Sequence, residues 1–180
     1  MQNNNMNRIW QGTVYSLMLI VAVCITGCTT PAPQTSSTLN QLPHAADKLL
    51  TANDILFSAL GQVGIPYRYG GSTPDSGFDC SGLIQYVYAE SANIQLPRTV
   101  AAMYQIDAPV VDEDNLQAGD LVIFATGWGG RPSHAGIYVG EGRFVHAPST
   151  GGAVRMDYLS EDYWQRSYLN AKRPLAALDQ

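Results

Sequence analysis

The spacing of hydrophobic and polar positions predicts helices in the first part of the chain and strands in the second. Apolar residues recur at helical spacing over residues 52–63 and again in a segment that runs from Cys80 to about residue 90. A third, short helix is predicted over 97–104. Between the first two helices, residues 64–71 mix turn-forming and aromatic side chains and are predicted to form a loop.

From residue 121 onward the pattern changes to short apolar runs separated by turn-forming residues, which is typical of strands. Gly140-Glu141-Gly142 is predicted to turn one run into the next as a β-hairpin. A short helical stretch is expected around Trp164. Helices followed by antiparallel strands predict an α+β domain, with N-terminal helices packed on an antiparallel sheet. The predicted strands are 121–124, 135–139, 143–146, 153–158 and 168–173.

Residues 1–27 have the pattern of a bacterial lipoprotein signal peptide. Arg8 precedes an apolar run over 14–25 that is short for a membrane span. The run ends in Ile25-Thr26-Gly27-Cys28, which resembles a lipobox and implies cleavage before Cys28 and lipid attachment to it. An uncleaved anchor or an ordinary signal peptide is the alternative. Residues 28–50 are rich in Thr, Ser, Pro, Gln and Asn, so they are predicted to be a flexible tether to a domain over 51–180.

Composition and charge narrow the class of partner. The chain is 46% hydrophobic and 14% charged, which is typical of a globular protein. Its formal charge of −5 argues against nucleic acid as a partner, because phosphate binding needs clustered Lys and Arg. The sequence holds neither a Cys-x-x-Cys pair nor a Walker-type glycine loop, and it predicts no cofactor.

The mature chain would keep a cysteine that has no disulfide partner. Cys24 would leave with the signal peptide and Cys28 would carry lipid, which leaves Cys80 unpaired in an oxidising compartment. Cys80 lies where a loop becomes a helix, and Asp79 or Ser81 is placed to cap that helix. Backbone N–H groups at a helix start stabilise an anion and are expected to lower the pKa of the thiol. The alternative is a small apolar residue packed under the helix.

Two of the three histidines flank the predicted hairpin. His134 begins its first strand and His146 ends its second, so both are expected at one end of the hairpin, whereas His44 lies in the tether. A nucleophilic thiol needs a base, and that base needs a group to orient it, so His134 is a candidate base and His146 a candidate orienting group. Half-buried strand histidines are one alternative. A zinc site made by Cys80 with both histidines is another, but it lacks an evident fourth ligand, and no metal is predicted.

Four motifs occur in order: 79–82 (Asp-Cys-Ser-Gly), 119–124 (Gly-Asp-Leu-Val-Ile-Phe), 134–140 (His-Ala-Gly-Ile-Tyr-Val-Gly) and 144–147 (Phe-Val-His-Ala). Together they resemble the NlpC family of bacterial cell-wall cysteine endopeptidases over about residues 51–174. The resemblance implies a papain-like α+β fold, a catalytic triad of Cys80, His134 and His146, and hydrolysis of peptide bonds in peptidoglycan stem peptides. Tyr67 matches a family tyrosine that points into the site.

The expected chemistry is attack of the Cys80 thiolate on an amide carbonyl, with the backbone N–H of Cys80 and the Tyr67 hydroxyl as candidate oxyanion donors. Arg68 and Arg98 are candidates for pairing with substrate carboxylates, the alternative being ordinary solvated surface residues. Family resemblance favours bonds next to diaminopimelate, either after γ-D-glutamate or in the D-alanyl cross-link. We favour the cross-link, because the glycine-rich segment 127–130 suggests an open cleft.

Two other functions remain open at this point: a papain-like amidase or acyltransferase of the cell envelope, and a non-catalytic lipoprotein that binds the wall. The expected location is the cell envelope, with a lipid anchor and the domain facing the periplasm. No Asp follows Cys28, and in a Gram-negative cell the resemblance to sorted lipoproteins favours an anchor in the outer membrane. A regulatory lipoprotein or protease partner is possible, but nothing in the sequence identifies one.

Overall fold

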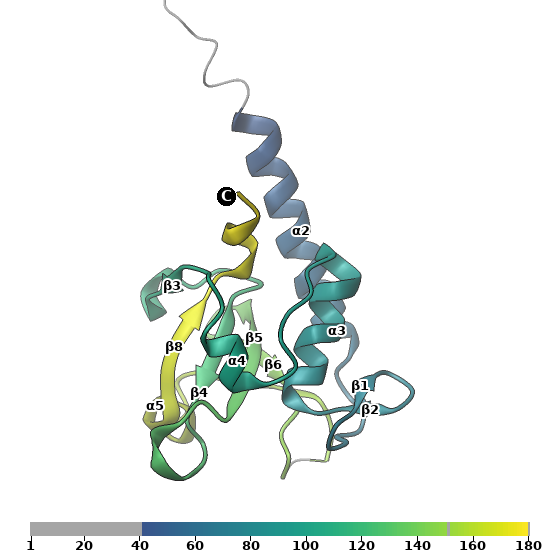
Figure 1. Cartoon of the computed structure of the whole chain (residues 1–180), viewed down its shortest axis with the longest axis vertical. Helices are drawn as coiled ribbons and strands as arrows, with labels where there is room; N and C mark the ends of the chain where they lie inside the picture. The colour runs from purple at the N-terminus through teal and green to yellow at the C-terminus, as the bar shows by residue number, and fades with distance from the viewer. Residues whose placement is uncertain (1–40, 151, 180) are drawn as a thin grey trace, which may run out of the picture. The chain divides into compact units, whose positions relative to one another are not determined.

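A computed structural model describes residues 41–150 and 152–179, and Figure 1 shows their arrangement. The predicted signal peptide, Cys28 and the tether up to residue 40 lie outside the described residues. Helices come first and strands follow, as the sequence pattern predicts. The α-helices are α2 (Gln41–Gly61), α3 (Cys80–Ala92), α4 (Val100–Tyr104) and α5 (Asp162–Ser167), and the short 3₁₀ helices are η1 (Glu113–Asn115), η2 (Trp128–Gly130) and η3 (Pro174–Asp179).

A six-stranded antiparallel sheet forms the second half of the domain, in the order β3-β8-β4-β5-β6-β7. The predicted α+β class, with helices packed on an antiparallel sheet, is confirmed. A separate two-stranded ribbon, β1 with β2, was not predicted, because two-residue strands carry no readable period. The strands are β1 (Ser72–Thr73), β2 (Gly77–Phe78), β3 (Val110–Val111), β4 (Leu121–Phe124), β5 (His134–Gly140), β6 (Arg143–His146), β7 (Arg155–Tyr158) and β8 (Tyr168–Lys172).

The sheet separates two hydrophobic clusters. Side chains alternate along a strand, so Leu121 and Ile123 of β4 join the cluster with α2 and α3, while Val122 and Phe124 join the cluster with Trp164 of α5. Figure 1 shows α3 to the right of the sheet and α5 to its left. Burial on both sides explains why β4 reads as a continuous apolar run.

The predicted β-hairpin is present as β5 and β6. Ile137 pairs with Val145, and Tyr138 pairs with Phe144. Glu141 in the turn has a positive φ of 54°, between two glycines that also have positive φ. His134 is the first residue of β5 and His146 is the last residue of β6, so the hairpin brings both to one end, as predicted.

Helix α2 begins at Gln41, well before the predicted start at residue 52. Residues 41–50 are therefore helical, where the sequence predicted a tether. The proline at position 43 falls in the first turn, where the missing N–H breaks no intrahelical hydrogen bond. Within the part of the chain that the structure describes, we find no helix with the length and apolar character needed to cross a membrane.

Candidate active site

Asp79 fixes the start of α3 and thereby the position of Cys80. Its carboxylate accepts a hydrogen bond from the Gly82 N–H at 2.7 Å, which confirms it as the N-cap. Its second oxygen accepts from the Gly70 N–H at 2.9 Å, which ties the preceding loop to the helix start. Cys80 is consequently the first residue of the helix, and the Asp79 carboxylate links the loop before it to the first helical turn after it.

Gly82 allows the loop to lie directly against α3. A Cβ at Gly82 would overlap the carbonyl oxygen of Gly71, and a Cβ at Gly71 would overlap the carbonyl oxygen of Gly77. The Gly71 carbonyl accepts from the Asp79 N–H at 3.1 Å. The loop and the first turn of α3 therefore pack at a separation that admits no side chain.

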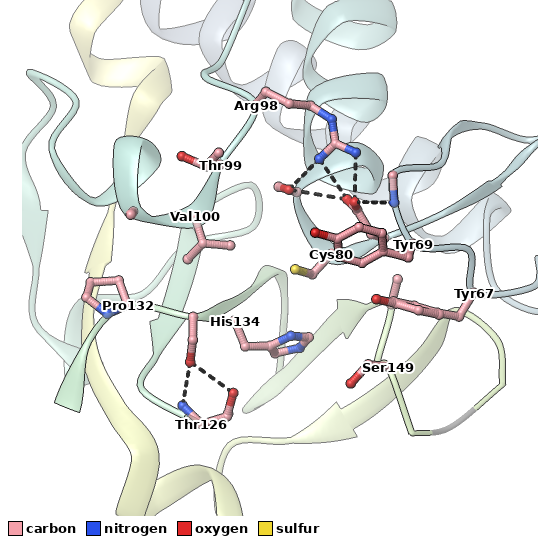
Figure 2. Close-up of a pocket in the computed structure, with 16 residues that line it drawn as sticks. Tyr67, Tyr69, Cys80, Arg98, Thr99, Val100, Thr126, Pro132, His134 and Ser149 are labelled. Carbon is pink, nitrogen blue, oxygen red and sulfur yellow. Dashed lines mark hydrogen bonds and ion pairs between the residues drawn. The ribbon is translucent and has the colours of Figure 1, made fainter. Parts of the chain in front are cut away.

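Cys80 and His134 line one open cleft of about 690 Å³. Figure 2 shows both side chains pointing into it, Cys80 from α3 and His134 from β5. The backbone N–H groups of Ser81, Ala135 and Cys80 itself face the sulfur. Further walls come from the loop before α3, the start of α4, the segment before β5 and the connection after β6, namely Tyr67, Tyr69, Arg98, Thr99, Thr126, Pro132, Ser133 and Ser149.

His134 and His146 contact each other directly. His134 Nε2 lies 2.8 Å from His146 Nδ1, and the other ring nitrogen of His146 lies 2.9 Å from Asp157 Oδ2. His146 is fully buried and His134 is 8% exposed. The structure thus contains a continuous chain of three polar side chains that begins at the cleft and ends at β7.

Aromatic rings enclose this chain on the α5 side of the sheet. Trp164 stacks on His134 with a centroid distance of 5.5 Å and meets His146 edge-on at 4.9 Å. Phe144 lies 4.9 Å from the His146 ring. These ring contacts bury His146 completely and hold the two imidazoles in place.

The pKa of the Cys80 thiol is shifted in the direction opposite to the prediction. Burial raises the pKa of the thiol, and the negative charge of Asp79 raises it further, against the lowering effect of the three facing N–H groups. The prediction of a lowered thiol pKa from the helix start alone is therefore wrong for the unliganded site. The residue that caps the helix also brings a negative charge close to the sulfur.

Both histidines are held neutral. Burial, followed by the neighbouring His146, lowers the pKa of His134 to about 3. Burial lowers the pKa of His146 to about 4, although Asp157 opposes that shift. With a thiol of raised pKa, the unliganded site at neutral pH holds a protonated sulfur beside a neutral imidazole. Such a pair can act by general-base catalysis, with proton transfer during attack.

The three residues predicted to bind substrate or stabilise an oxyanion lie in different places. Tyr67 lines the cleft, and burial raises the pKa of its hydroxyl, which therefore stays a proton donor. Arg98 also lines the cleft, but its guanidinium is engaged by Asp79 and Ser81. Arg68 is exposed and is not among the cleft-lining residues. The placement of the two arginines does not favour the predicted pairing with substrate carboxylates.

The segment before His134 borders the cleft only in part. Thr126, Pro132 and Ser133 line it, and the Ser133 hydroxyl accepts from the backbone N–H groups of Thr126 and Gly127 at 2.9 and 3.1 Å. Trp128, at the tip of the segment, is fully exposed.

The described residues contain no group of three or more Cys, His, Asp or Glu side chains arranged as a metal site. The ring nitrogens of His146 are directed at His134 and Asp157, which is not the arrangement of the zinc alternative.

Asp157 and Trp164 are site residues that the sequence analysis did not single out. Asp157 lies on β7, whose pairing places Asp157 opposite Phe144 and Arg155 opposite His146. Side chains two positions apart on a strand share a face, so Asp157 lies on the face of His146. The register could have revealed this, but residues 147–154 between β6 and β7 are too long a connection to fix it from sequence.

Comparison with known proteins identifies the family to which this chain is similar. The model described as "NlpC/P60 family" matches residues 64–173. Murein DD-endopeptidase MepH of Escherichia coli K12 is 49% identical over 113 residues, which cover 62% of this chain and 42% of that protein. Probable endopeptidase NlpC of the same strain is 36% identical over 162 residues, covering 88% of this chain and 98% of that protein. A crystal structure of an NlpC/P60 family protein from Bacillus cereus aligns with a TM-score of 0.63 and 32% identity, over 69% of this chain and 40% of that one.

The extent of these matches differs between relatives. The chain spans less than half of the length of MepH, but nearly all of the protein named NlpC. The matched segment contains the whole cleft and every strand of the six-stranded sheet.

Proposed function

The chain belongs to the NlpC/P60 family, and from this premise we propose that it is a peptidoglycan hydrolase, a thiol endopeptidase that cleaves amide bonds in murein stem peptides. The observation that carries the proposal is Cys80, the first residue of α3, sharing a cleft with His134, whose other side contacts His146. We assign these three residues as nucleophile, base and orienting group. Relatives named as murein or probable endopeptidases support the substrate class.

The proposed reaction has two halves. As the Cys80 sulfur forms a bond to the amide carbonyl carbon, its proton passes to His134. The carbon–nitrogen bond then breaks, and the leaving amine takes that proton from His134. Water, deprotonated by His134, attacks the resulting thioester, which releases the carboxylic acid and returns the proton to the sulfur.

Oxyanion stabilisation falls to donors beside the sulfur. The backbone N–H of Cys80 faces its own sulfur, and the hydroxyl of Tyr67 lies in the same cleft. Because burial raises the pKa of Tyr67, the hydroxyl keeps its proton and can donate to developing negative charge.

We place the scissile bond in the D-alanyl–diaminopimelate cross-link rather than after γ-D-glutamate. The name of the relative MepH, a murein DD-endopeptidase, supports the cross-link. An open cleft of about 690 Å³ has room for a branched peptide. Recognition would be local, because the formal charge of −5 cannot attract carboxylate-rich stem peptides over a distance.

The proposed location of the enzyme rests on the N-terminal segment, which lies outside the described residues. We propose that Cys28 carries a lipid anchor in the outer membrane. The domain would then face the periplasm, the compartment that contains its substrate. The sequence Ile25-Thr26-Gly27-Cys28 supports this.

The test is digestion of purified muropeptides by the wild type and by Cys80→Ala, with new amine and carboxyl ends identified by mass spectrometry. Cleavage of cross-linked dimers at the D-alanyl bond by the wild type alone is the expected result. Cleavage of uncross-linked tetrapeptide after γ-D-glutamate, with dimers intact, would move the scissile bond. A fully active Cys80→Ala variant would end the thiol mechanism. Hydrolysis of an unrelated amide or ester, with both muropeptides intact, would favour the amidase or acyltransferase alternative.

A further inference from the structure

Asp157 is the last member of the polar chain that starts at the cleft. Its Oδ2 lies 2.9 Å from His146 Nε2, and its side chain is 12% exposed. An ionised carboxylate accepts hydrogen bonds and cannot donate them. The proton of the neutral His146 ring must therefore be on Nε2.

This protonation determines the tautomer of the next ring. With its proton on Nε2, His146 has only a lone pair at Nδ1, and His134 Nε2 lies 2.8 Å from that atom. His134 Nε2 must consequently be the donor. The neutral His134 ring then carries its lone pair on Nδ1, the nitrogen that remains to accept a proton from Cys80.

Within the described residues, Asp157 is the side chain that occupies His146 Nε2. His146 is fully buried, and its ring is packed against Trp164 and Phe144 at centroid distances of 4.9 Å each. Both nitrogens are occupied by the contacts just described, one at each end.

We propose that Asp157 is a positioning residue that sets the tautomers of both histidines and so leaves His134 Nδ1 free to accept the Cys80 proton. This inference rests on the proposed function, because it assigns Asp157 a part in the same reaction. It extends the catalytic group from three side chains to four, with Asp157 acting through His146.

Arg155 keeps Asp157 in the required state. Its Nε lies 2.9 Å from Asp157 Oδ1, and its Nη2 lies 2.9 Å from Oδ2. Burial alone would raise the pKa of Asp157, but the hydrogen bond from Arg155 and the neighbouring His146 lower it. Glu161 also interacts with Arg155, which stays charged. A protonated Asp157 could donate to His146 and reverse the chain, and Arg155 prevents this by holding the carboxylate ionised and in place.

Asp157→Asn is the variant that tests whether Asp157 sets the tautomers of His146 and His134. An amide can donate to His146 Nε2, which would move the His146 proton to Nδ1. His134 Nε2 would then have to accept, and the His134 proton would move to Nδ1, where it faces the thiol and cannot act as a base. Replacing the carboxylate of a catalytic triad by an amide has this effect and costs about 10⁴-fold in kcat. Because Asp157 is one step further away, we expect a loss of at least about tenfold in kcat, with little change in KM.

Asp120→Asn is the matched control. Asp120 is a buried carboxylate directly before β4 of the same sheet, and two nitrogens of Arg173 each lie 2.8 Å from one of its oxygens. It is not among the cleft-lining residues. Both variants thus break a two-pronged Asp–Arg pair, and only Asp157→Asn removes the partner of His146. The control is expected to keep wild-type kcat on a soluble cross-linked muropeptide, at a temperature where circular dichroism shows both variants folded.

The second measurement reads the tautomers directly in a protein whose active site is intact. Histidine-selective ¹⁵N labelling of the full chain, with His44→Asn to remove the third histidine signal, reports the tautomer of each ring by NMR at neutral pH. We expect the proton on Nε2 of both His134 and His146, and a change of tautomer in Asp157→Asn. This readout decides the inference even if the variant does not fold.

A wild-type His146 protonated at Nδ1 would overturn the inference, as would a kcat for Asp157→Asn within twofold of Asp120→Asn. Either outcome, with Cys80→Ala inactive, leaves the proposed function standing. Full activity of Cys80→Ala would instead overturn the proposed function, whatever the tautomers of the two histidines are.

Discussion

Arg98 binds both carboxylate oxygens of Asp79, with Nη1 2.9 Å from Oδ1 and Nη2 2.7 Å from Oδ2. The arginine that sequence analysis offered as a substrate contact is thus engaged with the residue that caps α3. Burial would raise the pKa of Asp79, but the hydrogen bonds from Arg98 and Gly82 lower it overall. The pair keeps the cap ionised at the point where Cys80 enters the helix.

Arg98→Ala is expected to destabilise the fold by about 1–3 kcal/mol, because it leaves a largely buried carboxylate without its cation. Arg98→Lys should recover part of this, since an ammonium keeps the charge but not the two-pronged geometry. Urea denaturation measures both, with Arg166→Ala as a control, because its pair with Asp162 is exposed and should contribute within about 0.5 kcal/mol. Unchanged stability with a raised KM would instead support the predicted role in binding substrate carboxylates.

Gly82→Ala tests the contact between the loop and α3. Alanine is ordinarily better than glycine inside a helix, but the added Cβ would overlap the Gly71 carbonyl oxygen. We expect a loss of at least about 2 kcal/mol in the free energy of unfolding. Gly61→Ala is the control, since a Cβ there meets no atom within 4 Å and should change stability by less than about 0.5 kcal/mol. A Gly82→Ala protein as stable as Gly61→Ala would contradict the observed packing.

The neutral histidines make stability depend on pH. Their pKa values fall from 6.5 to about 3 for His134 and about 4 for His146 on folding. Between these values and 6.5 the unfolded chain binds more protons than the folded one, so stability is complete above pH 6.5 and is lost as pH falls. Urea midpoints measured from pH 7 to pH 4 should decrease steadily, and His134→Gln should make the decrease shallower. A stability that stays constant over this range would contradict the buried, neutral state.

Much of this fold follows from local pattern. The strand 121–124 and the hairpin strand 143–146 were predicted with the bounds that the structure has, the first from a short continuous apolar run and the second from the glycine-rich turn before it. Asp79 was predicted as a possible cap from its place before Cys80. The start of α2 was wrong because Thr, Ser and Pro around residues 29–38 suggested a continuous tether, and the composition does not show where the helix takes over.

The site was harder to predict where it depends on distant pairing. The hairpin brings His134 and His146 together through a two-residue turn, so the local sequence was enough to predict their proximity. Asp157 reaches His146 only through the register of β6 with β7, and Arg98 reaches Asp79 from a separate segment. The charge of Asp79 near the sulfur and the burial of Cys80 also reverse the simple expectation for the thiol, because the sequence does not show how tertiary packing desolvates the sulfur.

A further prediction concerns lipid attachment to Cys28, which lies outside the described residues. Cys28→Ser should leave the protein in the soluble fraction or uncleaved, and should abolish incorporation of labelled palmitate, because acyl chains on Cys28 are what would hold it at the membrane. Fractionation with and without detergent measures this. Normal processing with unchanged membrane association would argue against lipidation at Cys28.

The protonation state of Cys80 gives the last prediction. Burial and the Asp79 charge raise the pKa of the thiol, so peptide-mapped alkylation of Cys80 by iodoacetamide should be slow at neutral pH and should accelerate at higher pH than for an exposed cysteine. Asp79→Asn should shift that midpoint to lower pH, because it removes the nearby negative charge while its amide oxygen can still accept from the Gly82 N–H. Asp120→Asn serves as the control, since it removes a carboxylate that is absent from the cleft lining and should leave the midpoint unchanged. An alkylation rate that is already at its plateau at pH 6 would instead show a preformed thiolate–imidazolium pair, and the general-base description of the resting site would be replaced by that ion pair.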